Sequence, residues 1–300
     1  MSVIENTLKR LQGQRIATGT APASAHIAVA PAGAAARRQA SGDTAVPEPA
    51  IRIDHDVLRA AGMQPPAHQE HELSQEYRRI KRPLINGALG RGVAALPQGN
   101  LIMITSAVPG EGKTFMSLNL AFSTCLEEDV TVLLVDGDVV NPRISQILGV
   151  DHEQGLLDLV KDPSLPLASV ILSTDVPGLS FLSAGRQDAN ATELLASARM
   201  QAVMAQMGSA DPARLVLFDS APLLVTTESQ ALAHFAGQLL VVVRADHTPQ
   251  HVLLDALDTL DEGKPVSLVL NQTLRTSSGY YYQYGVSARP REPERQADSR

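Results

Sequence analysis

Residues 106–115, SAVPGEGKTF, place turn-forming residues directly before a Lys-Thr pair. The spacing Ala107-x4-Gly112-Lys113-Thr114 is that of a Walker A loop with Ala in the first glycine position. In such a loop the backbone N–H groups surround a phosphate, the lysine reaches the β- and γ-phosphates, and the hydroxyl binds Mg²⁺. The predicted ATP-binding residues of the loop are Pro109, Gly110, Glu111, Gly112, Lys113, Thr114 and Phe115.

Three aspartates follow apolar runs further along the chain. Asp136 and Asp138 end LLVDGD, and Asp219 ends VLFD. Carboxylates at the carboxyl ends of parallel strands face the crevice in which open α/β sheets bind ligands. There they can hold the water shell of Mg²⁺ or accept a proton.

Four of the five tyrosines form one cluster near the C-terminus, in SSGYYYQYG. They are Tyr280, Tyr281, Tyr282 and Tyr284. A sticky packing patch is one interpretation. Because a nucleotide loop lies in the same chain, autophosphorylation is the better one, and Gly279 and Gly285 would let the cluster enter an active site in extended form.

Short, continuous apolar runs alternate with helix-like stretches from residue 100 onwards. Strands buried on both faces have this pattern, and alternation of strand and helix predicts a mostly parallel sheet with helices on both faces. The fold class is therefore α/β of the P-loop NTPase type. The expected strands are 101–107, 130–136, 179–184, 214–219, 238–243 and 266–271, and the expected helices are 113–126, 192–207, 228–236 and 249–262.

The sequence divides into three parts by composition. Residues 1–70 are expected to hold a short N-terminal helix and a largely disordered linker rich in Ala and Pro. Residues 71–275 form the P-loop domain, opening with a helical stretch broken or kinked near Pro83. Residues 276–300 are expected to be a flexible tail that carries the tyrosines.

Charge and composition exclude several classes of protein. The formal net charge is −7, without a basic stripe, which argues against nucleic acid as a partner. The single cysteine, Cys125, fits a reducing compartment. No apolar run approaches the length of a membrane span, so we expect a cytoplasmic protein that reaches the inner membrane only through a partner.

The order of these motifs resembles the bacterial tyrosine kinases of capsule and exopolysaccharide export. The resemblance covers about residues 76–284 and includes the Walker A loop, Asp-x-Asp, and Asp219-x-x-Pro222. Glu76-x-x-Arg79-x-x-Arg82 resembles the oligomerisation motif of that family. The segments MSVIENTLKRL and EYRRIKRPL are similar to one subgroup, the soluble exosortase-associated tyrosine autokinases.

This resemblance implies an ATP- and Mg²⁺-dependent autokinase that regulates exopolysaccharide polymerisation or export. Lys113 would stabilise the transferring phosphoryl group, while Thr114, Asp138 and Asp219 organise Mg²⁺. Asp136 would orient or deprotonate the tyrosine hydroxyl. Asn271 is carried over as an adenine contact, with a strand-end cap as the equal alternative.

The resemblance also implies partners. Members of the family assemble into rings and phosphorylate a neighbour's tail, so a ring-like homo-oligomer with transfer in trans is expected. A membrane polysaccharide co-polymerase, or chain-length determinant, would supply the anchor, and a cognate tyrosine phosphatase would reverse the reaction.

Two alternatives to a kinase remain, and one of them rests on a departure from the family pattern. The family's Asp-x-Asp-x-Arg pattern has Val140 in place of Arg, with Arg143 three residues later, which leaves room for a non-catalytic regulator of chain length. A switch ATPase of the partition or septum-positioning type has the same fold. Such proteins carry a signature lysine at the position of Val108, which argues against that alternative.

Overall fold

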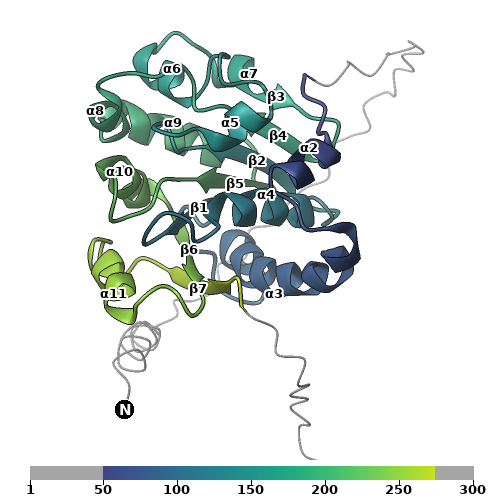
Figure 1. The fold of residues 1–300 in the computed structure, drawn as a ribbon. Coiled ribbons are helices and arrows are strands. Elements are labelled where there is room, and N and C mark those ends of the chain that lie inside the picture. Colours follow the sequence, from purple (N-terminus) through teal and green to yellow (C-terminus); the bar gives the residue numbers. More distant parts are fainter. Residues whose placement is uncertain (1–49, 274–300) are drawn as a thin grey trace, which may run out of the picture.

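A computed structural model describes residues 50–273 of the 300-residue chain. The apolar runs of the sequence form the strands of one sheet (Figure 1). The strands are β1 (Leu101–Ser106), β2 (Thr131–Asp136), β3 (Leu172–Ser173), β4 (Leu179–Leu182), β5 (Arg214–Asp219), β6 (Gln238–Arg244) and β7 (Val266–Asn271). All six predicted strands are confirmed, and the two-residue β3 was not predicted.

Within residues 50–273 the sheet has seven strands in the order β3-β4-β2-β5-β1-β6-β7. All neighbouring strands are parallel except β3 and β4. The predicted α/β class with a mostly parallel sheet is therefore confirmed. Since β1 lies between β5 and β6, the loop after β1 emerges near the middle of the sheet's carboxyl edge, where ligands bind in this class.

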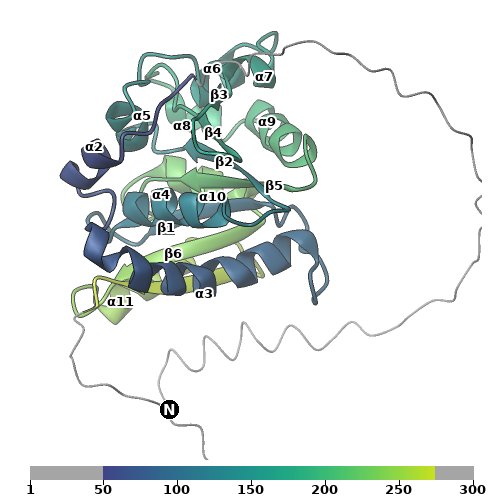
Figure 2. The same cartoon turned by 90° about the vertical axis from the view of Figure 1, so that its right-hand side faces the viewer.

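Helices cover both faces of the sheet (Figure 2). One face packs against α2 (His55–Ala60), α3 (Glu70–Leu89), α4 (Lys113–Thr124) and α5 (Arg143–Ile147), and the 3₁₀ turn η2 (Ala67–Gln69) precedes α3. The other face packs against α6 (Leu156–Lys161), α7 (Leu167–Val170), α8 (Ala191–Leu195), α9 (Ala198–Ser209), α10 (Thr227–Phe235) and α11 (Gln250–Asp258). The central strands are buried on both faces, which explains why their sequences are continuously apolar.

Two predicted helices differ from the expectation. The stretch 192–207 forms two helices, because Ser197 adopts an extended conformation and its side chain caps α9 by accepting a hydrogen bond from the N–H of Met200. In contrast, α3 is one continuous helix that contains Pro83, so a break there, which was one of the two outcomes that the sequence predicted, does not occur. Its buried residues, among them Tyr77 and Leu84, pack on the sheet and hold the helix in place.

The predicted linker ends earlier than residue 70. Residues 50–70 are ordered on the domain: Ile51 bridges to Thr174, and Leu58 of α2 is fully buried. Four of its apolar residues, Ile51, Ile53, Leu58 and Met63, pack in or against the core, although the composition of the segment predicted a linker. The rest of the linker and the tail from 276 onwards lie outside the described residues.

The membrane prediction can be compared only with the described part of the chain. Among residues 50–273, every helix is too short or too polar to cross a bilayer.

Candidate active site

The Walker A loop joins β1 to α4, as its motif predicts. Gly110 and Gly112 adopt left-handed backbone conformations, with φ of 83° and 92°. A Cβ atom on Gly112 would lie 2.1 Å from Nδ2 of Asn271. Glycine is required at residue 112 because the backbone is left-handed there and because no side chain fits beside Asn271.

Glu111 stabilises this loop from the inside. Its side chain is buried, and its carboxylate accepts hydrogen bonds from the N–H groups of Val108 (2.8 Å) and Arg244 (3.2 Å) and from the hydroxyl of Thr248. The sequence grouped Glu111 with the ATP-binding residues. The structure turns its carboxylate into the protein, so the side chain ties the loop to the end of β6.

Asn271 and Gln272 hold the same loop from the end of β7. Asn271 Nδ2 donates to the carbonyl of Glu111 at 2.8 Å, and Gln272 Nε2 donates to the carbonyl of Gly110 at 3.3 Å. Both residues line the cavity described below. Asn271, the predicted adenine contact, therefore lines the cavity, while its amide nitrogen is bonded to the Walker A loop. Gln272 was not predicted, and its position follows only from the end of β7.

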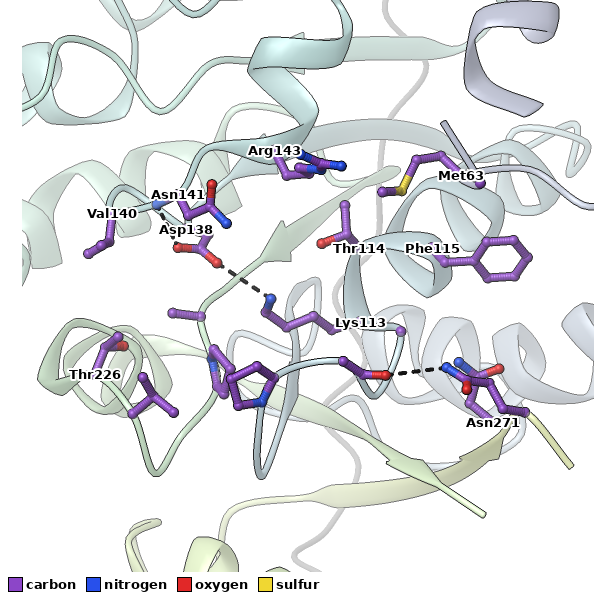
Figure 3. Close-up of a pocket in the computed structure, with 18 residues that line it drawn as sticks. Met63, Lys113, Thr114, Phe115, Asp138, Val140, Asn141, Arg143, Thr226 and Asn271 are labelled. Atoms are coloured by element: carbon purple, nitrogen blue, oxygen red, sulfur yellow. Dashed lines mark hydrogen bonds and ion pairs between the residues drawn. The ribbon is translucent and has the colours of Figure 1, made fainter. Parts of the chain in front are cut away.

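A cavity of about 700 Å³ opens over the loop (Figure 3). Five segments of the chain meet there. The lining residues are Gly62, Met63, Pro109, Gly110, Gly112, Lys113, Thr114, Phe115, Asp138, Val140, Asn141, Arg143, Ala221, Pro222, Val225, Thr226, Asn271 and Gln272. Of the predicted ATP-binding residues, only Glu111 lies outside this lining.

Lys113 and Asp138 form an ion pair in the cavity. Lys113 Nζ lies 3.4 Å from Asp138 Oδ2, and 17% and 8% of the two side chains are exposed. The other carboxylate oxygen of Asp138 accepts the N–H of Asn141 at 3.1 Å, which fixes the turn after β2. The pair places one positive and one negative group, both largely desolvated, where a phosphate would be bound.

Asp136 and Asp219 form a second, fully buried pair behind the cavity. They are register partners on β2 and β5. Asp136 Oδ2 accepts the N–H and the hydroxyl of Ser145, both at 2.8 Å, while Asp219 Oδ1 accepts the hydroxyl of Ser117 at 2.8 Å. Neither aspartate lines the cavity, so the structure turns the Asp136 carboxylate toward Ser145 and away from any acceptor bound there.

The surroundings of both buried carboxyls favour the neutral form. Burial, and then the charge of Asp219, raises the pKa of Asp136 to about 7, against the hydrogen bonds from Ser145. Burial raises the pKa of Asp219 to about 6, against the charge of Lys113 and the hydrogen bond from Ser117. At neutral pH, the protein therefore holds Asp136 close to half-protonated.

This raised pKa predicts a pH-dependent stability. Between about pH 4 and 7 the folded protein keeps a proton on Asp136 that the unfolded chain has lost, so the free energy of unfolding falls as the pH rises and levels off above 7. Asp136→Asn removes this titration. The free energy of unfolding of Asp136→Asn minus that of wild type should therefore increase as the pH rises from about 4 to 7, by up to about 4 kcal/mol.

Urea denaturation at pH 5, 6, 7 and 8, without nucleotide or Mg²⁺, measures the difference. Glu262→Gln, a change at an exposed carboxylate on a loop, serves as the control and should show no such trend. A constant difference between Asp136→Asn and wild type over the whole range would contradict the prediction.

Oxygen atoms at this site fit Mg²⁺. Oδ2 of Asp219 is buried and has no hydrogen-bond partner among residues 50–273, while Thr114 and Asp138 line the adjoining cavity. In the same part of the chain, no group of three or more His, Cys, Asp or Glu side chains could hold a metal ion alone. Mg²⁺ characteristically binds one or two carboxylates together with the phosphates of a substrate, which this arrangement allows.

The departure from the Asp-x-Asp-x-Arg pattern and the nearby arginine both lie at the cavity. Val140 lines the cavity with 55% of its surface exposed, and Arg143, the first residue of α5, lines it as well (Figure 3). Arg143 therefore supplies a guanidinium to the cavity three residues after the position where an arginine was expected.

The predicted oligomerisation residues lie on the outer face of α3. Glu76, Arg79 and Arg82 are all exposed, and Arg79 Nη1 lies 3.8 Å from Glu76 Oε2. The opposite face of α3, which includes Tyr77, is buried against the sheet. The four clustered tyrosines, Tyr280, Tyr281, Tyr282 and Tyr284, lie outside the described residues.

Comparisons with known proteins point to one group. No family model matches the chain. A tyrosine-protein kinase of Acinetobacter johnsonii is 32% identical over 185 residues, which is 61% of this chain and 25% of that protein. A putative tyrosine-protein kinase, EpsB, of Ralstonia nicotianae is 32% identical over 212 residues, which is 67% of this chain and 28% of that protein.

The same group appears among solved structures. The crystal structure of the VpsO kinase domain is 25% identical, has a TM-score of 0.56, and covers 70% of this chain and 100% of that domain. The chain spans about a quarter of the length of the first curated relatives it matches. The similarity therefore lies in a kinase domain.

Proposed function

We propose, from the premise that this chain is a homologue of the kinase domains of bacterial tyrosine-protein kinases, that it transfers the γ-phosphoryl group of ATP to tyrosines of its own C-terminal cluster. The observation that carries the proposal is the Lys113–Asp138 pair inside a Walker A cavity, in a chain that also carries four closely spaced tyrosines at 280–284. The relatives are named kinases, which favours this function over a switch ATPase or a non-catalytic regulator.

The loop residues would bind the phosphates of ATP. The N–H groups of residues 110–114 point a partial positive charge at the anion, and the first turn of α4 adds its dipole. Lys113 neutralises negative charge on the transferring phosphoryl group, and this attraction is strong because the site is largely desolvated. Thr114, Asp138 and Asp219 would hold Mg²⁺, which supplies charge neutralisation to the phosphates when bound.

We assign the contact with the acceptor hydroxyl to Asp138 rather than to Asp136. Asp138 lines the cavity and approaches Lys113, so its carboxylate lies near the site of transfer. A tyrosine hydroxyl that attacks the γ-phosphorus must give up its proton, and a carboxylate at hydrogen-bond distance can accept it. Asp136 would act through Ser145, by holding the start of α5 in position.

The wall beside Asp138 suits an aromatic acceptor. Val140 and Val225 line the cavity and are more than half exposed, and Pro222 is a further apolar residue of the lining. Apolar groups exposed around a polar centre favour a ligand with an apolar body and a polar end, which describes tyrosine better than serine.

Mass spectrometry of the purified chain after incubation with Mg²⁺ and ATP tests the function. We expect phosphate on residues among Tyr280, Tyr281, Tyr282 and Tyr284, and none after incubation with ADP. ATP hydrolysis without any phosphotyrosine would support a switch ATPase instead. Binding of ATP without hydrolysis or transfer would support the regulator.

We also propose that the chain forms a homo-oligomer through α3. Glu76, Arg79 and Arg82 are exposed on one helix and present one negative and two positive charges. Within one molecule such exposed pairs contribute little, about 0–1 kcal/mol. Their loss should therefore leave the fold intact and act on contacts between molecules.

Arg79→Ala combined with Arg82→Ala is expected to lower the oligomeric fraction several-fold at a given concentration. Light scattering over a dilution series measures this, with Arg78→Ala, an exposed arginine on the same helix, as the matched control. Identical masses for the double variant and wild type would remove α3 from the interface.

Partners and location are further parts of the proposal. A membrane polysaccharide co-polymerase would bring the chain from the cytoplasm to the inner membrane, and a tyrosine phosphatase would reset the tail. The resemblance to the kinases of capsule and exopolysaccharide export supports the membrane partner, because export takes place at a membrane.

A further inference from the structure

Residues 50–64, here called the N-terminal strap, start beside β3 at the edge of the sheet and continue through α2 (Figure 1), and Gly62 and Met63 of this strap line the cavity. At the edge, Ile51 exchanges backbone hydrogen bonds with Ser173 and Asp175, and the N–H of Ile53 donates to Asp175 Oδ1 at 2.9 Å. The strap then forms α2, whose Leu58 is buried in the core beneath it. The segment is thus attached along its length before it reaches the cavity.

The cavity end of the strap is held at Met63. Its N–H donates to the carbonyl of Leu58 at 2.8 Å, and its carbonyl accepts Asn119 Nδ2 at 2.8 Å. Asn119, on α4, is buried and donates also to the carbonyl of Phe115 at 2.7 Å. One amide group therefore fixes the backbone of Met63 relative to that of Phe115, and both side chains line the cavity.

Met63 and Phe115 lie at the end of the cavity away from Asp138. In Figure 3, Lys113 and Thr114 separate Asp138 and Val140 on one side from Met63 and Phe115 on the other. The γ-phosphate belongs at the Lys113–Asp138 pair. The phosphate chain therefore directs the sugar and base of a nucleotide toward Phe115 and Met63.

We propose that the N-terminal strap completes the nucleotide site, with Met63 forming one wall of the subsite for the purine base. This inference rests on the proposed binding of ATP, and it adds a residue that lies before the region that resembles known kinases, about 76–284. A thioether is polarisable and packs well against a flat aromatic ring. Half-buried Met63 is anchored by its backbone on both sides, so its contact with a base requires little ordering of the chain.

Comparison of two probes tests the role of Met63. AMP-PNP carries both base and phosphates, while tripolyphosphate carries only the phosphates. With Mg²⁺ present, Met63→Ala should weaken the binding of AMP-PNP about three- to tenfold in calorimetry and change the binding of tripolyphosphate less than twofold. Met63→Leu, which keeps the apolar wall, should restore most of the affinity.

Val57→Ala is the matched control, because Val57 is on α2 in the same strap, is 47% exposed and does not line the cavity. It should alter neither affinity. The inference is overturned if Met63→Ala leaves AMP-PNP binding unchanged, if it weakens both probes equally, or if the wild type binds AMP-PNP no more tightly than tripolyphosphate. These are binding measurements, so failure to find phosphotyrosine would refute the kinase proposal without affecting them.

Discussion

Lys113→Met is expected to abolish phosphorylation of the tyrosine cluster, by about a thousandfold or more, while the chain stays folded. Lys113 is the first residue of α4, and its amino group is held in the cavity at 3.4 Å from Asp138. Its charge acts mainly on the transferring phosphoryl group, where negative charge must be stabilised in a largely desolvated site. Methionine keeps most of the unbranched apolar stem and removes the ammonium group, with its charge and its hydrogen-bond donors.

The measurement is phosphotyrosine content of the chain made in a host without other tyrosine kinases. Lys161→Met is the matched control, because Lys161 forms an ion pair with Asp188 on the surface, far along the chain from the Walker A loop. The control should keep full activity. Undiminished phosphotyrosine in Lys113→Met would refute the assignment of the active site.

The positions of the strands follow closely from the sequence. A strand buried on both faces needs a continuous apolar run, and β1, β2, β5 and β6 are such runs. The Walker A loop is equally predictable, since Gly112 has a backbone conformation and a neighbour, Asn271, that allow no side chain. The apolar runs and the Walker A glycine each lie within a few neighbouring residues, so both can be recognised without knowledge of distant contacts.

The ordered strap could not be predicted in the same way. Its contacts are with residues far along the chain, such as Ser173 and Asn119, and its apolar residues are too few to show a period. The short helices α5, α6 and α7 were missed for a related reason. A helix of four to six residues spans less than two turns, so tertiary packing decides its formation.

The direction in which a side chain of the site points could not be predicted from the sequence. The sequence places Glu111 in the phosphate loop and Asp136 at a strand end, but it cannot say which way either side chain points. In the structure both carboxylates are buried and accept hydrogen bonds from inside the protein. Asp138, only two residues after Asp136, faces the cavity because β2 has ended and the chain turns at Asn141.

Substitution of the two aspartates of the Asp-x-Asp motif should therefore have unequal effects. Asp138→Asn is expected to lower the rate of phosphoryl transfer at least a hundredfold, because the neutral amide cannot accept the tyrosine proton and brings no negative charge to Mg²⁺. Asp136→Asn should cost less than tenfold. Its carboxyl has a pKa of about 7, so asparagine imitates a neutral form that the wild type already populates at neutral pH.

Single-turnover phosphorylation at pH 7.5, with AMP-PNP affinity measured in parallel, separates transfer from binding. If Asp136 positions α5 through Ser145, its variant should change nucleotide affinity and transfer only slightly, and a Ser145→Ala variant should resemble it. A much larger loss of transfer for Asp136→Asn than for Asp138→Asn would reverse the assignment. Asp136 would then be the group that orients the tyrosine hydroxyl, as the sequence predicted, and the turn after β2 would have to open to bring it there.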